Sequence, residues 1–345
     1  MTESSTYTAA GVNIDEAGRA LRAALPKIQS TYLEPVLAGV GGFGALFRAG
    51  FPGMLNPVLV ASIDGVGTKT KVAAMVGKFE GLGHDIVNHC VNDILCQGAK
   101  PLFFLDYFGA GKLDGLVFEE VLNGASEACR NVGMSLIGGE TAEMPGVFHD
   151  HEFDVVGSIT GVVEAEQRLP REKARVGDRV IALASSGLHT NGFSLARRVL
   201  FEVNGLSVRD TLDGLDDTIG NTLLEPHKCY YNAVYPMLGA DTPIRALAHI
   251  TGGGLYDNIP RALSSDVAIA IDRGSWQVPI IFRHIQELGQ VADPEMYRAF
   301  NMGIGLIMIV DRDSTQHVLS VLEERGQVAT TVGEVIAGSR EVRIL

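Results

Sequence analysis

Residues 64–69 (Asp-Gly-Val-Gly-Thr-Lys) concentrate more phosphate-binding chemistry than any other stretch of the chain, and they closely follow the apolar run 57–61. The pattern predicts a strand that ends in a loop. Glycines let backbone N–H groups approach an anion, Thr and Lys add donors, and a carboxylate can hold a cation against phosphate oxygens. A plain turn after a strand is the alternative. The candidate phosphate-binding residues are Asp64, Gly65, Gly67, Thr68 and Lys69.

A helix predicted over 85–97 carries a second acid, Asp93, on the face opposite its apolar stripe. Mg²⁺ is commonly held by one or two carboxylates together with substrate phosphates. We therefore expect Asp93 to share a Mg²⁺ ion with Asp64. For Asp85 and His89, on the same polar face, a solvated helix surface is the expected explanation.

A third acid, Glu140, follows a predicted strand that ends in two glycines, Gly138 and Gly139. It is expected to be a further ligand of the cation or a substrate contact. A turn with a capping acid is the alternative. The expected metal ligands are thus Asp64, Asp93 and Glu140.

Two glycine-rich loops in the second half suit a substrate. Residues 185–192 follow the apolar run 180–184 and precede a predicted helix, where backbone N–H groups favour an anion. Capping of this helix by Thr190 or Asn191 is the alternative, and it leaves His189 without a role.

The other loop has three consecutive glycines (252–254) shortly after His249. Such a run is costly unless a backbone or a ligand approaches closely. A histidine beside it can polarise an amide or move a proton near neutral pH, or it can simply bond the loop backbone. The remaining histidines are expected at the surface or at caps. The catalytic candidates are Asp93, His189 and His249, and the substrate-binding candidates are Glu140, Thr190, Asn191, Gly252 and Gly253.

Strand-like runs alternate with helical patterns, which predicts an α/β or α+β fold. The charged segment 164–179 contains Pro170 and is the best linker candidate, so we expect domains at 1–168 and 174–345. The predicted strands are 57–63, 101–106, 134–138, 153–163, 179–185, 244–249, 267–271, 303–310 and 328–336. The predicted helices are 85–97, 116–131, 192–203, 226–238, 280–289 and 315–325.

Composition limits the function classes. With 345 residues, 46% of them hydrophobic, the chain can bury a large core, and a net charge of −13 without a basic cluster argues against generic nucleic-acid binding. No apolar stretch matches a bilayer span and no signal segment is visible, so a soluble cytoplasmic protein is expected. The four cysteines lack metal-binding spacing and are expected to be reduced thiols.

Taken in order, the motifs resemble the phosphoribosylformylglycinamidine cyclo-ligase family, also called aminoimidazole ribonucleotide synthetase. The resemblance runs from about residue 7 to the end, and the runs Gly-Gly-Glu-Thr-Ala-Glu-Met-Pro-Gly and Leu-Phe-Phe-Leu-Asp-Tyr are its most specific parts. The matching segments are 10–15, 41–46, 64–69, 90–93, 105–107, 138–146, 185–191, 251–254 and 300–303.

The resemblance implies a two-domain ATP-using synthetase whose N-terminal sheets pair into a dimeric barrel, so a homodimer is expected. It also implies that ATP with Mg²⁺ phosphorylates the formyl amide oxygen of formylglycinamidine ribonucleotide. An amidine nitrogen then closes the imidazole ring, and ADP and phosphate are released. His189 and Asn191 are implied near the substrate, and His249 near the proton that the amidine loses.

Two alternatives stay open. Another ATP-dependent synthetase or kinase of the same superfamily would share residues 64–69. Of these relatives, a selenophosphate synthetase would have a reactive Cys near its N-terminus, and the hydrogenase maturation relative would end in a Cys. A non-catalytic nucleotide-binding protein would keep the glycines and lose the three acids.

Overall fold

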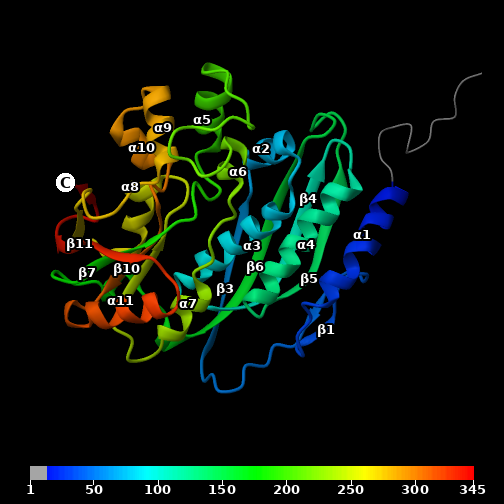
Figure 1. The fold of residues 1–345 in the computed structure, drawn as a ribbon. Coiled ribbons are helices and arrows are strands. Elements are labelled where there is room, and N and C mark those ends of the chain that lie inside the picture. Colours follow the sequence, from blue (N-terminus) through cyan, green and yellow to red (C-terminus); the bar gives the residue numbers. More distant parts are fainter. Residues whose placement is uncertain (1–13) are drawn as a thin grey trace, which may run out of the picture. The chain divides into compact units, whose positions relative to one another are not determined.

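The computed structural model describes residues 14–345, which form two compact units (Figure 1). Of the described residues, the first unit comprises 14–54, Ala61–Cys90 and Pro101–Gly161, and the second comprises Leu55–Val60, Val91–Lys100 and Val162–Leu345. Of the motif at 10–15, the part before residue 14 lies outside the described residues. Among the described helices, none has both the length and the hydropathy that crossing a bilayer requires.

The first unit is built on a four-stranded sheet in the order β3-β6-β4-β5. Helices α3 and α4 lie against one of its faces (Figure 1). Side chains along β4 alternate accordingly, because Phe104 and Phe108 are buried whereas Leu105 is 37% exposed. The strands are β3 (Pro57–Gly65), β4 (Lys100–Ala110), β5 (Ser135–Glu143) and β6 (Phe153–Glu164).

Helices α3 (Glu80–Leu95) and α4 (Gly115–Asn131) approach each other through glycines. A Cβ atom on Gly83 would lie 2.1 Å from the Val121 carbonyl oxygen, and one on Gly124 would lie 2.0 Å from the Glu80 carbonyl oxygen. The two backbones therefore pack at a distance that no larger residue permits.

The first unit contains four more described elements, all absent from the sequence prediction. Helix α2 begins at Lys69, the last of the phosphate-loop candidates, and is capped at its C-terminus by Gly77, which adopts the left-handed conformation with φ 79°. Helix α1 packs against α4. These elements are α1 (Ile14–Gln29), β1 (Val36–Ala38), β2 (Leu46–Phe47) and α2 (Lys69–Val76).

The second unit is built on a six-stranded sheet in the order β12-β9-β11-β7-β10-β8. Strand β10 is antiparallel to both β7 and β8, and its residue Leu306 pairs with Leu183 on one side and with His249 on the other. The C-terminal ends of β7 and β8 therefore meet at one edge of the sheet. The strands are β7 (Arg179–Ala184), β8 (Ile244–His249), β9 (Val267–Ile271), β10 (Ile304–Val310), β11 (Ala329–Ala337) and β12 (Val342–Ile344).

Most predicted elements of this unit are confirmed, and helix α9 has the predicted bounds. The predicted helix 226–238 is wrong in its first part, because regular structure begins only at Tyr231. The helices are α5 (Phe193–Arg197), continued by the π-helical turn η3 (Arg198–Val203), α6 (Ile219–Leu224), α7 (Tyr231–Val234), α8 (Gly254–Asn258), α9 (Ile280–Gly289), α10 (Asp293–Ala299) and α11 (Thr315–Glu324). Short 3₁₀ turns are η1 (Ala165–Gln167), η2 (Arg171–Lys173), η4 (Tyr235–Met237), η5 (Ile259–Ala262) and η6 (Arg312–Ser314).

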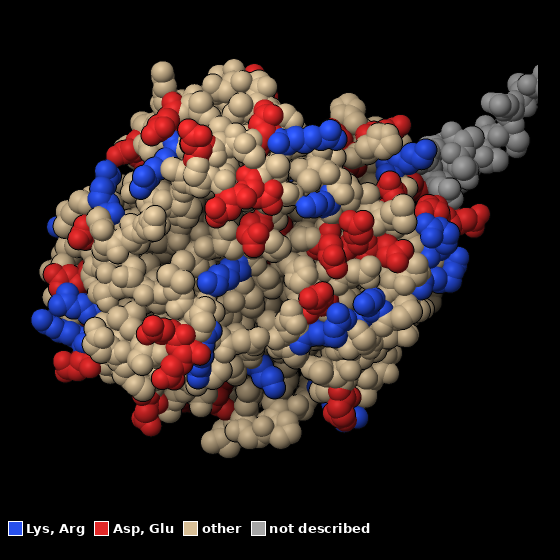
Figure 2. All heavy atoms as spheres, in the orientation of Figure 1, with Lys and Arg blue, Asp and Glu red and all other residues tan. Residues whose placement is uncertain are grey.

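Surface charge and cysteines agree with the composition. On the face drawn in Figure 2, the described Lys and Arg residues are interspersed with Asp and Glu instead of gathering in one basic area. All four cysteines are free thiols, as expected.

Alanine substitution should have opposite effects at a glycine in the contact between α3 and α4 and at a glycine outside it. Gly124→Ala should destabilise the protein by roughly 1–3 kcal/mol or more, because its Cβ would overlap a backbone oxygen. Gly18→Ala in α1 is the matched control: its Cβ would meet only the mobile end of Arg22, so the helix propensity of Ala should stabilise by roughly 0.5–1 kcal/mol. Urea unfolding of both variants measures the difference. Equal midpoints for the two variants would refute the packing argument.

Candidate active site

The phosphate-loop candidates in the first unit begin at the end of β3. Asp64 Oδ1 accepts a hydrogen bond from the Gly65 N–H at 2.7 Å, and Asp64 Oδ2 lies 2.9 Å from His89 Nε2. The Asp64 side chain is 40% exposed, whereas that of His89 is 3% exposed. Gly67 has φ 65°, a conformation that glycine adopts without strain. The loop thus presents a carboxylate to solvent that is oriented from behind by an imidazole.

Lys69 and Asp85 form a buried ion pair. Lys69 Nζ lies 2.9 Å from Asp85 Oδ1, and both side chains are 0% exposed. The ammonium group of Lys69 is therefore directed into the protein core. The expectation that Asp85 and His89 form a solvated helix face is wrong. Asp85 is the counter-charge that the buried Lys69 requires, and the buried His89 lies against the Asp64 carboxylate.

Glu140 is exposed on β5, at the edge of the first sheet. It lines a cavity of about 330 Å³, together with Asp106 on the neighbouring strand and residues of α1 and α4. Burial raises the pKa of Asp106 to about 7. Near neutral pH this carboxyl group can therefore keep its proton and act as a hydrogen-bond donor.

In the second unit, Asp93 and His249 are brought into direct contact. Asp93 Oδ1 lies 2.8 Å from His249 Nδ1, and the two side chains are 29% and 3% exposed. Asp93 comes from α3, and His249 is the last residue of β8. Burial and the negative charge of Asp93 raise the pKa of the nearby Cys96, which stays a neutral thiol.

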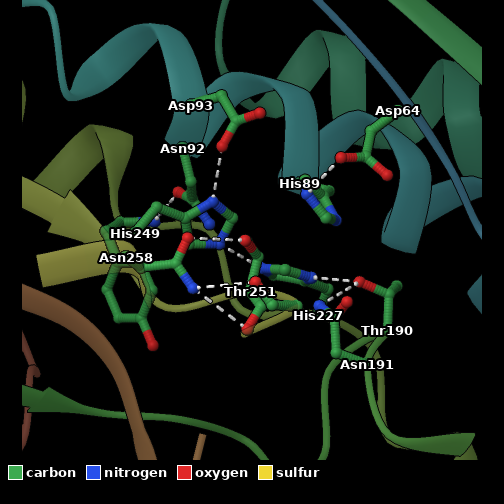
Figure 3. Close-up of polar contacts among 12 residues, drawn as sticks. Asp64, His89, Asn92, Asp93, Thr190, Asn191, His227, His249, Thr251 and Asn258 are labelled. Atoms are coloured by element: carbon green, nitrogen blue, oxygen red, sulfur yellow. Dashed lines mark hydrogen bonds and ion pairs between the residues drawn. The ribbon is translucent and has the colours of Figure 1, made fainter. Parts of the chain in front are cut away.

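The contact continues through a residue that the sequence analysis did not single out. His249 Nε2 lies 2.9 Å from His227 Nε2, and His227 Nδ1 lies 3.4 Å from Thr190 Oγ1. Figure 3 shows Asp93, His249, His227 and Thr190 following one another in this order. We call these four residues the imidazole chain.

His189 completes the cluster by stacking on His227, with 3.9 Å between ring centroids. His189 adopts φ 60°, which is uncommon for a residue other than glycine and occurs often at functional sites. Gly305 on β10 makes room for this cluster, because a Cβ there would lie 1.9 Å from Tyr230 Oη and 2.6 Å from His189 Cε1. The predicted catalytic residues His189 and His249 are therefore linked by His227.

The helix that follows the 185–192 loop is shorter and less regular than predicted. Gly192 is the residue before the helix, with φ 79°, and α5 is five residues long before it changes into a π-helical turn. Thr190 and Asn191 do not cap it. Instead, Thr190 contacts His227, and Asn191 Nδ2 donates to Thr190 Oγ1 at 3.5 Å.

The triple-glycine loop has a packing explanation for two of its members. A Cβ on Gly254 would lie 2.0 Å from the Tyr297 carbonyl oxygen, and one on Gly253 would lie 2.5 Å from Asp257 Cβ. A Cβ on Gly252 would instead lie 3.2 Å from Asn191 Oδ1, so Gly252 is the glycine of this run that lies beside the 185–192 loop.

The side-chain amide of Asn258 holds this loop in place. Its Nδ2 donates to the carbonyl oxygens of Thr251, Gly252 and Gly254 at 3.2, 3.1 and 2.9 Å (Figure 3). The loop therefore obtains its shape from a buried amide, and His249 is not needed to hold it open.

The predicted residues are divided between the two units. Residues 64–69 and Glu140 belong to the first unit, where strands β6 and β4 lie between β3, which carries Asp64, and β5, which carries Glu140. The second unit contains Asp93, His189, Thr190, Asn191, His249 and the glycine loop. The expectation that the other histidines lie at the surface or at caps is wrong for His89 and His227, which are 2% and 1% exposed. In the sequence, no neighbouring residue singled out His227, because Pro226 before it is compatible with the first position of the helix predicted there.

Two family models match the chain. One, described as AIR synthase related protein, N-terminal domain, matches residues 53–163, and the other, described as AIR synthase related protein, C-terminal domain, matches residues 175–345. Among curated proteins, the chain is 46% identical over 332 residues to the phosphoribosylformylglycinamidine cyclo-ligase of Caldanaerobacter subterraneus subsp. tengcongensis, covering 96% of this chain and 98% of the relative. It is 45% identical over 340 residues to the protein of that name from Pseudothermotoga lettingae, covering 98% and 99%.

Solved structures with a similar fold are more distant. Thiamine-monophosphate kinase from Stenotrophomonas maltophilia K279a matches with a TM-score of 0.69 at 18% identity, covering 93% of this chain and 95% of that chain. Hydrogenase maturation protein HypE in complex with ATP matches with a TM-score of 0.65 at 18% identity, covering 94% and 88%. At this identity the likeness concerns the fold.

The Lys69–Asp85 pair predicts a large stability effect. Asp85→Ala should cost roughly 3–5 kcal/mol, because the buried ammonium of Lys69 loses its counter-charge. The control is Glu16→Ala, which removes the 29% exposed carboxylate paired with Arg19 in the same unit and should cost at most about 1 kcal/mol. Chemical unfolding of both variants gives the comparison. If Asp85→Ala unfolds at the wild-type midpoint, the ion pair does not stabilise the fold.

Proposed function

This chain belongs to the phosphoribosylformylglycinamidine cyclo-ligase family and is a cyclo-ligase of purine biosynthesis, and we propose that it closes the imidazole ring of aminoimidazole ribonucleotide. The expected two-domain α/β fold of this family is confirmed. The observation that carries the function is the identity of 46% to a cyclo-ligase along almost its whole length.

The proposed substrate is formylglycinamidine ribonucleotide, with ATP as co-substrate. The γ-phosphoryl group moves to the formyl amide oxygen and ADP forms. An amidine nitrogen then attacks the activated carbon, loses a proton, and the former amide oxygen leaves as part of inorganic phosphate. Phosphorylation is required because an amide oxygen is a poor leaving group, and the transfer itself needs mainly positioning and charge neutralisation.

For the nucleotide end of this reaction, we propose the loop from Asp64 to Thr68. The 40% exposed carboxylate of Asp64 offers the oxygen ligands that Mg²⁺ prefers, and the adjacent N–H groups suit phosphate oxygens. When bound, Mg²⁺ would neutralise the charge of the phosphates. Glu140, in the same unit as Asp64, and Asp93, in the second unit, remain predicted carboxylate ligands of this ion.

For ring closure, we propose the edge of the second sheet where β7 and β8 end. There the imidazole chain lies beside the 185–192 loop and Gly252, the predicted substrate contacts. The carboxylate of Asp93 fixes the proton of His249 on Nδ1, as an orienting acid does for a catalytic histidine. His189, Thr190 and Asn191 are proposed to contact the substrate.

A homodimer formed by pairing of N-terminal sheets is also proposed. Large apolar side chains on the face of the first sheet opposite the helices support it, since Ile63 is 68% exposed and Leu105 is 37% exposed. Exposed apolar groups of this size on a sheet face are typical of an interaction surface.

The function is tested by phosphate release from ATP with and without formylglycinamidine ribonucleotide. Wild-type protein should release phosphate only when that substrate is present, and Asp93→Asn should lower kcat by at least about 100-fold with an unchanged circular dichroism spectrum. The control is Asp241→Asn, an exposed position, which should behave as wild type. Phosphate release without the substrate would contradict the proposed reaction, and full activity of Asp93→Asn would remove this carboxylate from the mechanism.

A further inference from the structure

His227 contacts three of the residues proposed for ring closure, although no chemical role was predicted for it. Its ring stacks on His189 with 23° between the planes, and its nitrogens face His249 Nε2 at 2.9 Å and Thr190 Oγ1 at 3.4 Å. It is 1% exposed. A single buried side chain thus connects both catalytic histidine candidates with the substrate loop.

The backbone on both sides of His227 is held by the polar side chains of Ser186 and Asn92, of which Asn92 is fully buried. Ser186 Oγ donates to the Pro226 carbonyl oxygen at 2.5 Å, and Asn92 Nδ2 donates to the Lys228 carbonyl oxygen at 2.8 Å. Asn92 Oδ1 accepts from the Tyr230 N–H at 3.0 Å. These bonds explain why the segment before α7 is not helical, and they leave the imidazole ring little freedom to move.

The hydrogen bonds along the imidazole chain have one consistent direction. The Asp93 carboxylate accepts, so His249 Nδ1 carries a proton and the Nε2 of a neutral His249 is an acceptor. Only one proton fits between the two Nε2 atoms at 2.9 Å, so His227 Nε2 donates it. His227 Nδ1 is then the acceptor for the Thr190 hydroxyl. The Thr190 oxygen in turn accepts from Asn191 Nδ2, which agrees with this direction.

This direction means that both nitrogens of His249 are engaged within the protein. Its influence on the substrate loop therefore passes through His227 to Thr190. A metal ion shared by His189, His227 and His249 would be a different use of the cluster, since one nitrogen of each lies within 4.8 Å of the others. The stacked rings of His189 and His227 argue against it, because ring nitrogens bind a metal in the ring plane and two stacked planes do not converge on one ion.

We propose that His227 is a positioning residue for the ring-closing reaction: it locks the Nδ1–H form of His249 and orients Thr190 and His189 toward the substrate. This inference rests on the proposed function. Because the Thr190 hydroxyl donates its proton to His227, its oxygen can only accept hydrogen bonds from other groups. A hydrogen-bond donor of the substrate, such as an amidine N–H, is the group that this oxygen suits.

Three substitutions separate the contacts of His227. His227→Phe keeps a flat ring for stacking and removes both nitrogens. His227→Gln places its amide near the former Nε2 and so retains a link to His249, whereas His227→Asn places its amide near the former Nδ1 and retains a link to Thr190. Because the link to His249 is the shorter one, Gln should preserve more activity than Asn.

We expect His227→Phe to lower kcat about 10- to 100-fold, in the range found when a group that orients a functional side chain is removed, with the KM for ATP nearly unchanged. His227→Gln should regain at least part of this loss, and His227→Asn less. Melting temperatures of the same preparations identify any loss due to unfolding. Wild-type kcat in His227→Phe, or equal losses in all three folded variants, would overturn the proposal.

A spectroscopic measurement tests the inference without relying on turnover. In protein labelled with ¹⁵N-histidine, long-range ¹H–¹⁵N spectra should show His249 with its proton on Nδ1 and an unprotonated Nε2. His249→Gln assigns the signals. In His227→Phe the His249 signals should shift toward a mixture of the two neutral forms. An Nε2–H form of His249 in the wild type would overturn the inference even if the cyclo-ligase activity is confirmed.

Discussion

The hydrogen bond between the Asp93 carboxylate and His249 Nδ1 is the interaction on which the arrangement of the second unit's site depends. A buried imidazole that donates from one nitrogen must find a donor for the other, and in this protein His227 is that donor. The same requirement then applies to His227, which finds the hydroxyl of Thr190. A single carboxylate, on helix α3, thereby determines the direction of hydrogen bonds as far as Thr190 in the 185–192 loop.

The sheet of the second unit makes this chain possible. Strand β10 lies between β7 and β8, so the loops that follow these two strands are separated by one strand only. Gly305 of β10 has no side chain, and the space is taken by Tyr230 and His189. Tyr230 Oη donates to the Ala184 carbonyl oxygen at the end of β7, which ties the segment carrying His227 to the sheet. Burial raises the pKa of Tyr230 well above its ordinary value, so it remains a donor at any physiological pH.

The sequence predicted the strands of the second unit well because their apolar runs are distinct, and α9 was predicted with its correct bounds. It predicted the end of β8 at His249, but β4 and β5 continue to Ala110 and Glu143, beyond their predicted ends at 106 and 138. It did not predict the segment before α7, because the bonds from Asn92 and Ser186 that hold it extended come from residues distant in sequence. Tertiary contacts of this kind override local helix propensity.

The same limit explains the partners that the sequence did not reveal. Lys69 pairs with Asp85, which is buried on another helix. His89 was expected in solvent and instead orients Asp64. His227 follows a proline and lies in no glycine-rich loop, so only the meeting of three segments at the sheet edge gives it a role. Sequence spacing provided the candidate ligand residues, and it missed His89 and His227, which contact them within the fold.

A double-mutant cycle between Asp93 and His227, the first and third residues of the imidazole chain, tests the central claim most directly. The cycle compares kcat/KM for wild type, Asp93→Asn, His227→Phe and the double variant, with formylglycinamidine ribonucleotide as substrate. If the four residues act as one hydrogen-bonded unit, the second substitution should add less than about a tenfold loss to the first. Losses that multiply fully would show that Asp93 and His227 act independently, and would contradict the account.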